Sequence, residues 1–421
     1  MTTAQIVVKV GFNQGWNVAS AATYTTITTA NKVRSLYITR GKKDALSKLQ
    51  TGRCILEVDN TNGYLDPSNT DAPSPYQDSG ATQVLPGRKI DIEVISPKDG
   101  STIQLFGGFV ERWVQQSRGH GHDQVTIIEA VDFMKGMAQA KCDATTRPAE
   151  TTGERFSALA GMASSALIRG YTTLMETAPE KTYTKTMNVL DEIDKVNDAE
   201  VGIVFSERSI SQIEMLSRAE VLAGGETRPG ILGQFTDDTG ADSGWLPYHD
   251  VKMFWDDDKI TNLANATVYD TATTATEATD ATSQTRYGVR GRDETALMLN
   301  SAASATTWCD YLVDRQKEPD HRVASLTFFP QADTGLWSVL LTADPGNLYQ
   351  VRRHPATGAT VTHIVQAEGI VHKADANRWT TTMNFSSDKG GAYWVLDSDG
   401  SGGYAALSTL GTTTKLAYLT V

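Results

Sequence analysis

Two histidines flank a glycine in this chain, His120 and His122, and they are the first residues whose types could do chemistry. Imidazole nitrogens bind transition metals, and the carboxylates of Asp123 or Glu111 could add further ligands. The glycines within and before the pair are typical of a turn, and two imidazoles are too few for a closed zinc site. We therefore expect an ordinary turn here, without a metal.

Two acidic stretches, residues 59–63 and 397–400, resemble calcium-binding loops in composition only. Neither has the glycine at the sixth position or the glutamate at the twelfth position that an EF-hand loop uses. Turns in which Asn and Asp side chains bond the following backbone are the simpler interpretation.

Paired carboxylates could hydrolyse a glycosidic bond. Acids at this density are expected in any chain with a formal net charge of −12, however, and no catalytic motif surrounds them. The sequence has no GxSxG elbow, no P-loop and no GxGxxG that opens a helix. It therefore predicts neither an enzyme nor a cofactor. The carboxylates considered for hydrolysis are Asp256, Asp257, Asp258, Glu176 and Glu180.

Four aromatic residues crowd a loop-rich segment, as they would in a carbohydrate-binding site: Trp245, Tyr248, Phe254 and Trp255. Aromatic rings also dominate cores and protein interfaces. Core or interface packing is the preferred interpretation, and a glycan site stays open as the alternative.

The elements that must position any site are organised around residues 53–114. Apolar residues alternate there with polar ones in two runs, and a period of two predicts half-buried antiparallel strands. The alternating apolar residues are Cys54, Leu56, Val58, Ile90, Ile92 and Val94.

A long loop rich in Asn, Asp and Pro separates these two strands. Such residues fix turns, and a loop of this length inside a compact sheet is usually functional. Its apolar content is too small to predict a core, so we expect it to contact a neighbouring chain. The residues expected at this contact are Asn62, Asp66, Pro67, Pro75 and Tyr76.

Alternation elsewhere predicts strands over residues 5–12, 33–39, 124–133, 201–205, 322–329, 337–342, 348–353, 360–371 and 379–385. Helical spacing predicts helices over 151–167, 187–196 and 293–317, the first opening with a capping pattern. Residues 223–258 are expected to form loops with short strands, and the Ala/Thr tract 271–285 an exposed excursion of a sheet. We expect four segments: a β domain (1–148), a mixed α/β insertion (149–258), a second β domain with a helix (259–387) and a C-terminal extension (388–421).

The charge balance argues against a protein that holds nucleic acid, because such binding depends on Lys and Arg. Seven basic residues nevertheless lie between Lys32 and Arg53, against one acid. This cluster could dock a partner through Arg40, Lys42 and Lys43, although a solvated hairpin face is the commoner case.

The three cysteines are odd in number and far apart, which predicts neither a disulfide framework nor a zinc site. The sequence has no apolar run of membrane-spanning length, and its start lacks a signal-peptide pattern. We expect synthesis in the cytoplasm of the cell that makes the protein.

Several pieces occur in a suggestive order: CILEVDNTNGYLDP, SPY, VLPGRKI and FGGFVERW, then NVLDEI with GIVF, DATSQTRYGVR, LYQVRR, VQAEGIVH and RWTTTMNF. This order resembles that of the tail hub, or minor tail, proteins of long-tailed bacteriophages, which are similar in fold to the baseplate hub of contractile-tailed phages. The resemblance covers roughly residues 1–385, and residues 210–258 match nothing in it.

The resemblance implies a mainly β fold with an α/β insertion and two tail-tube-like β-barrel domains per chain. It further implies a homotrimer at the distal tail tip of the virion, which closes the tail tube, joins the distal tail protein to tip or fibre proteins, and gates the exit of the tape-measure protein and DNA. DNA would only pass through the channel. The alternatives are a tail-associated cell-wall hydrolase, a glycan-binding adhesin, or the hexameric distal tail ring protein.

Overall fold

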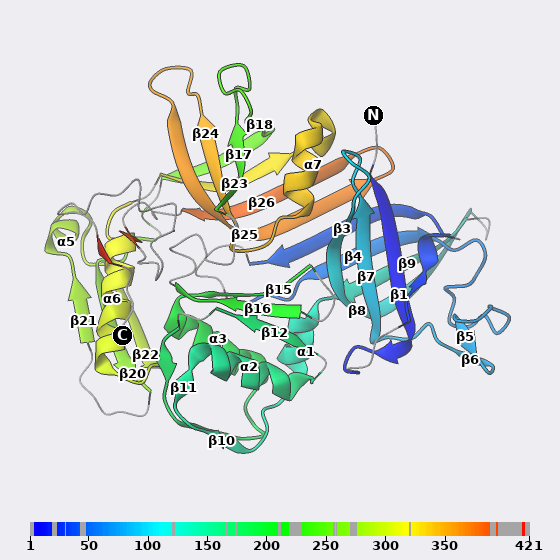
Figure 1. The fold of residues 1–421 in the computed structure, drawn as a ribbon, viewed down its shortest axis with the longest axis horizontal. Coiled ribbons are helices and arrows are strands. Elements are labelled where there is room, and N and C mark those ends of the chain that lie inside the picture. Colours follow the sequence, from blue (N-terminus) through cyan, green and yellow to red (C-terminus); the bar gives the residue numbers. More distant parts are fainter. Residues whose placement is uncertain are drawn as a thin grey trace, which may run out of the picture.

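The computed structural model describes residues 4–18, 23–29, 31–42, 48–119, 123–165, 167–172, 175–208, 212–218, 230–255, 257, 259–269, 276–319, 321–387, 393–394 and 415–416. Fourteen strands of this described part form one sheet, which curves into two barrel-like units lying side by side (Figure 1). An α/β unit and a small three-stranded unit lie below and beside them.

The first barrel-like unit is formed by strands whose apolar residues alternate inward, as the sequence predicts. Its core holds both predicted alternating runs, every member of which is fully buried. In pairing order its strands are β2 (Thr25–Thr26), β1 (Gln5–Gly15), β7 (Arg88–Ile95), β8 (Thr102–Arg118), β9 (Asp123–Val131), β4 (Arg53–Asp59) and β3 (Val33–Gly41). The 3₁₀ turn η1 (Ile27–Thr29) packs on β1, and the long loop after β4 carries β5 (Gln77–Asp78) and β6 (Ala81–Thr82).

The second barrel-like unit continues the same sheet beyond β3. Its core is lined by apolar residues that alternate along its strands. Its strands are β18 (Leu246–Pro247), β17 (Ile231–Thr236), β24 (Leu348–Arg353), β25 (Val361–Asp375), β26 (Trp379–Ser387), β23 (His321–Phe328) and β19 (Asp250–Trp255). The predicted two β-barrel domains are therefore confirmed.

Helix α7 (Thr334–Leu341), which follows the 3₁₀ turn η3 (Pro330–Ala332), packs between the two barrel cores. Leu336 and Leu340 belong to the core of the second unit, whereas Trp337 and Leu341 belong to the core of the first. One short helix therefore closes both cores at once.

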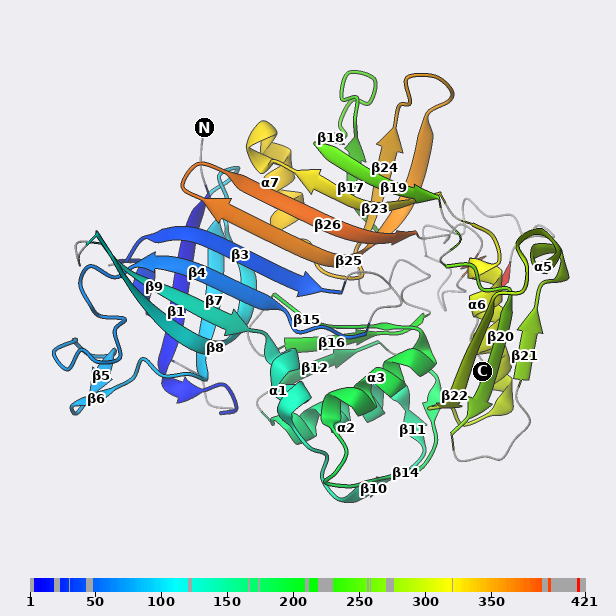
Figure 2. The ribbon, with the colours of Figure 1, turned by 180° about the vertical axis from the view of Figure 1, so that it is seen from behind.

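The α/β unit packs two amphipathic helices on a three-stranded sheet (Figures 1 and 2). The capping pattern predicted at its first long helix is present, because Thr151 and Glu154 bond each other's backbone reciprocally. Its elements are α1 (Phe133–Gln139), β10 (Thr145–Arg147), β11 (Glu150–Thr151), α2 (Thr152–Ala163), β12 (Ile168–Tyr171), β13 (Thr177–Ala178), β14 (Lys181–Tyr183), α3 (Val189–Glu200), β15 (Ile203–Ser206) and β16 (Gln212–Leu216).

The small unit packs helix α6 (Ala302–Gln316) on a sheet of its own, with Trp308 at its core. Its other elements are β20 (Leu263–Val268), β21 (Thr276–Thr279), α5 (Ala281–Tyr287) and β22 (Gly291–Leu297). Near the chain end, β27 (Tyr393–Trp394) pairs with β28 (Lys415–Leu416). None of the helices in the described ranges is both long and apolar enough to cross a membrane.

Two predicted elements are wrong in type. The strand expected at 337–342 is helix α7, where burial of the apolar residues follows helical spacing and Asp333 caps the first turn by accepting the Gly335 N–H. The first part of the helix expected at 293–317 is strand β22, and α6 begins only at Ala302, after the cap Ser301.

The predicted domain boundary at residue 258 does not follow sheet membership. Strands β17 and β19 precede it and yet pair within the second barrel-like unit. The small unit, residues 263–316, lies beyond it and has its own sheet. The second barrel-like unit is thus interrupted in sequence by the small unit. Part of the Ala/Thr tract also has regular structure, as β21 and α5.

Candidate interaction sites at the junction and on the arm

The two barrel-like units are joined along β3 and β25, which pair antiparallel from Ser35–Asp375 to Gly41–Gly369. The Lys42 N–H continues the ladder and donates to the Glu368 carbonyl at 2.8 Å. A shared strand pair fixes the distance and the angle between the units, because sliding it by one residue would turn every side chain to the opposite face.

Two glycines face each other at the end of this ladder. Gly41 has a φ of +77°, and a Cβ built on it would lie 2.2 Å from the Glu368 carbonyl oxygen. A Cβ on Gly369 would lie 2.4 Å from the carbonyl oxygen of Lys42. Both distances are far inside van der Waals contact, so the close approach of the strands depends on these glycines.

We expect Gly41→Ala to lower the free energy of unfolding by about 2–4 kcal/mol, because it combines left-handed backbone strain with a backbone clash. Gly100→Ala is the matched control: its φ is +73°, but nothing lies within 4 Å of its Cβ position. The control should cost only about 1–2 kcal/mol. Equal losses in urea unfolding of the two variants would show that the strands do not need this close approach.

A buried ionic cluster lies beside the glycines and connects three units. Arg40, on β3, donates to the Asp344 carboxylate at 2.5 Å and to the Ser206 carbonyl at 3.2 Å. Arg208, which follows β15, donates to the other Asp344 oxygen at 2.9 Å. Asp344 thus neutralises charges from the first barrel-like unit and from the α/β unit while it belongs to the second. Such a carboxylate orients all three units.

His372, on β25, is fully buried beside this cluster. Its Nδ1 lies 3.0 Å from the Thr381 hydroxyl, and its Nε2 has no hydrogen-bond partner among the described residues. Burial lowers the pKa of His372 to about 3, and the nearby charges of Arg40 and Arg208 contribute to this lowering. The imidazole is therefore neutral at physiological pH.

The junction is expected to weaken in acid through His372. Its folded pKa lies below the unfolded value of about 6.5, so the unfolded state binds more protons, and this contribution to stability is lost as the pH falls from about 6.5 towards 3. Between pH 7 and pH 5 the loss is about 2 kcal/mol. His372→Gln keeps a polar group for Thr381 and should remove this part of the pH dependence.

The pH dependence of stability must be compared between the wild type and His372→Gln, because a second buried group, Asp132, shifts stability with pH in the opposite direction. Burial raises the pKa of Asp132 to about 7, although the backbone N–H groups of Gly52 and Met134 oppose this shift. The folded state favours the neutral carboxyl, so Asp132 stabilises the protein in acid. This contribution is lost as the pH rises from about 4 through 7. Urea unfolding at pH 7 and pH 5 should give a difference between wild type and His372→Gln; identical pH profiles would contradict the assignment.

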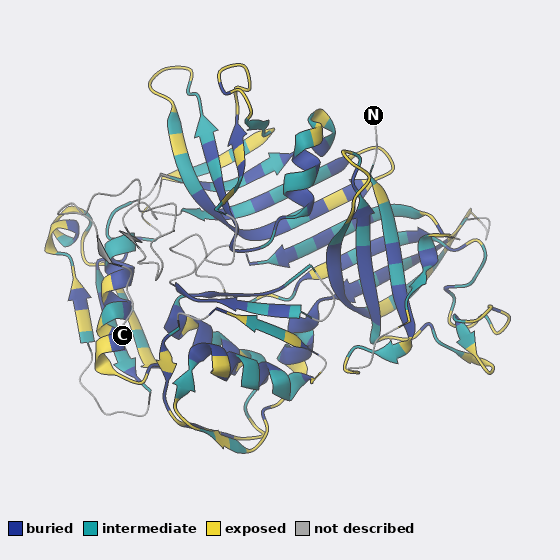
Figure 3. Ribbon diagram, viewed as in Figure 1, coloured by how far each residue is buried: buried dark blue, intermediate teal, exposed yellow. Residues whose placement is uncertain are grey.

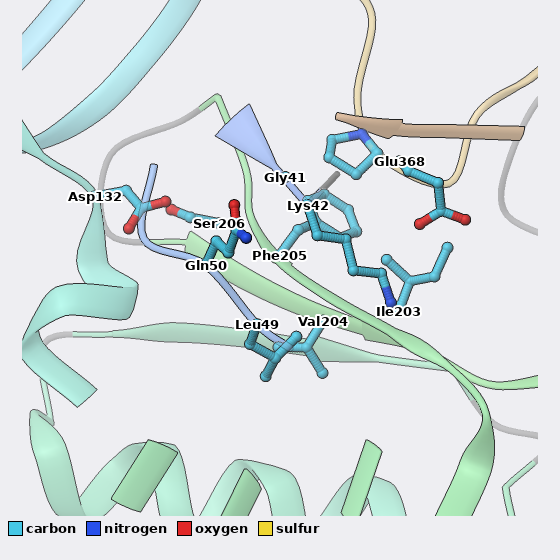
Figure 4. Close-up of a pocket in the computed structure, with 11 residues that line it drawn as sticks. Gly41, Lys42, Leu49, Gln50, Asp132, Ile203, Val204, Phe205, Ser206 and Glu368 are labelled. Atoms are coloured by element: carbon cyan, nitrogen blue, oxygen red, sulfur yellow. The ribbon is translucent and has the colours of Figure 1, made fainter. Parts of the chain in front are cut away.

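A small pocket lies where the units meet, and Figure 4 shows its lining side chains converging from β15, from β25 and from the segment after β3. It combines apolar side chains of β15 with the charged groups of Lys42, Asp132 and Glu368. All three charged side chains are buried. The pocket therefore belongs to the packing of the junction.

The structure places two of the predicted docking residues inside the chain. Arg40 and Lys42 are only 4 % and 5 % exposed, and Arg40 donates to the carbonyls of Ala343 and Ser206 and to the Asp344 carboxylate. Lys43 lies outside the described residues. Docking of a partner protein through this cluster stays a prediction. The buried Arg40 side chain binds Asp344 and Ser206 within the chain.

The long loop, residues 62–83, projects from the first barrel-like unit as an arm (Figure 1). Its base is anchored: Tyr76 is buried with its ring 5.0 Å from that of Phe12, and Leu65 is fully buried. The expectation that the loop adds nothing to a core is thus wrong at its base. Asn62 is hydrogen-bonded to Asn31.

The outer part of the arm is solvent-exposed (Figure 3). Asp66 accepts two hydrogen bonds from Ser68 in a tight turn, Pro67 is exposed, and Pro75 is partly buried. Contact of the arm with a neighbouring chain stays a prediction.

The candidate metal and calcium residues have other tasks in the described structure. Asp123 and Asp59 both form ion pairs with Arg34, and Glu111 pairs with Lys135 at 3.4 Å. The expected Asx turn is confirmed at Asn62, whose side chain accepts the N–H group of Tyr64, and the Asn60 side chain accepts the N–H group of Leu65 further along the loop. His120, His122 and residues 397–400 lie outside the described part.

The candidate hydrolytic carboxylates are dispersed. Glu176 is buried in the α/β unit and pairs with Arg218, Glu180 is exposed, and Asp257 pairs with Arg290 at 2.5 Å. Asp256 and Asp258 lie outside the described residues. No acid pair facing a cleft emerges from the described carboxylates.

The four candidate aromatics separate into two pairs at opposite ends of β19. Before β19, the centroid of the Trp245 ring lies 4.0 Å from the Arg352 guanidinium carbon, and the Tyr248 hydroxyl donates to the Arg352 carbonyl. At its far end Phe254 and Trp255 are exposed. The two pairs therefore do not form one glycan platform.

Comparison with known proteins identifies the fold. No family model matches the sequence, and no curated protein sequence matches it either. A tail protein from Neisseria meningitidis MC58 superposes with a TM-score of 0.56 at 10 % identity, over 92 % of this chain and 97 % of the other. The 43 kDa tail protein of prophage MuSo2 from Shewanella oneidensis gives 0.54 at 12 % identity, over 92 % and 98 %. The chain has the fold of phage tail proteins.

A chain of the PdpA–VgrG complex from Francisella also superposes, with a TM-score of 0.50 at 10 % identity, over 91 % of this chain and 58 % of that one. These identities show the fold and no more. The resemblance predicted from the order of sequence pieces is confirmed at this level. Residues 210–258, which matched nothing in sequence, supply strands β16 to β19 in the structure.

Sequence reasoning missed the residues that join the two units of this tail-protein fold: Gly41, Arg208, Asp344, Gly369 and His372. Arg208 and Asp344 are isolated in sequence, whereas Gly369 and His372 lie within the piece VQAEGIVH, which gave no indication of a joint between units. The one available signal was a glycine in each of two strand segments, GK at Gly41 and EGIVH at Gly369, which is typical of close strand approach.

Proposed function

We propose that this chain is a structural tail hub that forms a homotrimeric ring at the distal end of a phage tail tube. One observation carries the proposal: a continuous strand pair between β3 and β25 holds two tube-like barrels side by side in one chain. Three such chains place six barrels around one axis, which matches a six-fold tube. The tail-protein fold over 92 % of the chain supports the same role.

The ring explains why the joint is built rigidly. Two barrels linked by a flexible connection would lose their six-fold spacing, whereas a paired ladder and a buried ionic cluster preserve it. A closed ring also leaves fewer sheet edges exposed to aggregation. The rigid joint is thus the physical requirement for imitating a hexamer with a trimer.

We infer that its partners are the distal tail protein on one side, tip or fibre proteins on the other, and the end of the tape-measure protein in the channel. The likeness to a chain of a PdpA–VgrG complex supports partners of the spike class in general. DNA passes through the ring without being held, in keeping with a net charge of −12 per chain.

Immuno-electron microscopy of purified virions tests the position. Antibodies raised against the chain are expected to label one end of the tail, opposite the head. Labelling along the whole tube would assign the chain to the tube itself, and labelling at the head would reject the tail role.

We further propose that the chain does not cleave cell walls, because Glu176 and Asp257 are committed to ion pairs. Zymograms with peptidoglycan from several hosts are expected to stay blank for the purified protein. A cleared band that disappears in Asp257→Asn would identify a hydrolase and overturn this expectation.

A further inference from the structure

The small unit is inserted in the second barrel-like unit, between β19 and β23, and both of its connections pass through one stalk. Thr261, on the outgoing connection, donates its N–H to the Gln316 carbonyl at 2.9 Å, and the side chains of the two residues are also hydrogen-bonded at 2.9 Å. Connections that lie side by side restrain a unit less than connections at its opposite ends. The small unit can therefore turn about this stalk.

The small unit is fastened, however, to the α/β unit, beside which it lies in both views (Figures 1 and 2). The Trp308 indole N–H donates to the Asp198 carbonyl at 2.9 Å, and the Asn300 N–H donates to the Thr177 carbonyl at 2.9 Å. Ala199, on α3, is part of the core of the small unit. The small unit thus belongs to the second barrel-like unit by its chain connections and to the α/β unit by its packing.

Two aromatic rings of the small unit cover buried cations of the α/β unit. The centroid of the Tyr269 ring lies 4.7 Å from the Nζ of Lys181, which pairs with Glu192 at 2.5 Å. The centroid of the Tyr311 ring lies 5.4 Å from the guanidinium carbon of Arg218, which pairs with a second buried carboxylate. Both ion pairs lie within the α/β unit, so they persist when the rings leave, and water then solvates the cations. Uncovering such a surface costs less than uncovering a purely apolar core.

Strained backbone lies at the same contact. Only three non-glycine residues of the described part have a positive φ, and two of them are found here. Val201 ends α3 with a φ of +49° and packs against the core of the small unit. Ala296, with a φ of +58°, lies on β22, which packs against α3. A left-handed backbone is unfavourable for both residues, above all for the β-branched valine, and such strain persists only where the surroundings enforce it. Loss of the contact is therefore accompanied by relief of strain.

We propose that the small unit is a hinged strap, which lifts from the α/β unit as a folded body and closes again over Lys181 and Arg218. The stalk at Thr261 and Gln316 allows the movement, the ion pairs beneath the strap lower its cost, and the strained backbone favours it. This strap goes beyond the proposed function and does not depend on the number of copies in the ring.

Hydrogen exchange at the Asn300 amide of the full-length chain measures the lifting, because this amide is hydrogen-bonded across the contact. In the wild type it is expected to exchange at least about tenfold faster than the amides inside α6, which stay folded when the strap lifts. Tyr269→Ala should raise the exchange rate at Asn300 by about another tenfold and leave α6 unchanged, because Lys181 then loses the ring that covers it in the closed state. Tyr269→Phe keeps the ring and should exchange like the wild type.

Tyr37→Ala is the matched control. The centroid of the Tyr37 ring also lies near a lysine, 5.4 Å from the Nζ of Lys373, and Tyr37 is half-buried like Tyr269, but it belongs to β3. Its removal should leave the exchange at Asn300 unchanged. Equal effects of the two Tyr→Ala variants would overturn the strap, and so would an Asn300 amide that exchanges as slowly as α6 in the wild type. Exchange in α6 that rises together with Asn300 after Tyr269→Ala would show that the small unit unfolds instead of lifting, which would overturn the strap as well.

Discussion

Replacing Asp344 with alanine is expected to lower the free energy of unfolding by about 3–5 kcal/mol. The variant leaves Arg40, whose side chain is only 3 % exposed, without its carboxylate in the centre of the molecule, and it removes the partner of Arg208 as well. A buried charge without a partner loses its hydration and receives little in return. Urea unfolding followed by far-UV circular dichroism measures the loss.

Glu129 supplies a closely matched control. It also receives two arginines, Arg53 and Arg112, and its side chain is 16 % exposed against 15 % for Asp344. Its arginines, however, are 49 % and 60 % exposed and can return to water. Glu129→Ala should therefore cost only about 0–1 kcal/mol. If both variants lost the same amount, burial of the arginine would not be the reason for the effect.

Trp337→Ala is expected to cost about 3–5 kcal/mol, because it opens a large cavity where α7 meets the first core. The Trp337 ring is 1 % exposed and lies edge-on to Trp379, on β26, at a centroid distance of 5.5 Å. Its loss should also loosen the second unit, since Leu336 and Leu340 on the same helix belong to that core. Hydrogen exchange is expected to rise in the strands of both barrel-like units.

Trp255→Ala tests whether the size of the lost ring alone matters. This tryptophan is 70 % exposed, so its removal should change the stability of the single chain by no more than about 0.5 kcal/mol. Exchange that rises in one unit only after Trp337→Ala would show that α7 does not couple the two cores.

The strands of the first barrel-like unit could be predicted because their local pattern agrees with their burial. Cys54, Leu56 and Val58 alternate with polar residues on β4, and each apolar side chain of the run is fully buried. Helix α2 was equally accessible, since Thr151 and Glu154 mark its start. In these elements one face contacts a core and the other contacts water, so the spacing of apolar residues in the sequence indicates whether the element is a strand or a helix.

The pattern failed where an element meets cores on two sides. In α7 the residues Leu336, Trp337, Leu340 and Leu341 serve two different cores, so the apolar run LWSVLL shows no single stripe and resembles a buried strand. The strands that precede residue 258 and belong to the second barrel-like unit, β17 and β19, escaped prediction for another reason. β19 and β23 pair across the intervening residues 256–320, and local patterns carry no information on such a distant partner.

The candidate site likewise combines residues that the sequence could predict with residues that it could not. Turn residues on the arm were visible in sequence, because Asn, Asp and Pro act through their own backbone. The junction was not, because Arg40 looks like any exposed basic residue until Asp344 and Arg208 are brought beside it by the fold. The basic cluster in the sequence suggests that Arg40 docks a partner, whereas its burial in the structure gives it a role within the chain.

The symmetry of the tail at the position of this chain tests the central claim most directly. A cryo-EM map of the distal tail end from purified virions, refined without imposed symmetry, should show three copies of the chain around the axis, with their six barrels in one ring. Six copies, each contributing a single barrel to the ring, would contradict the account.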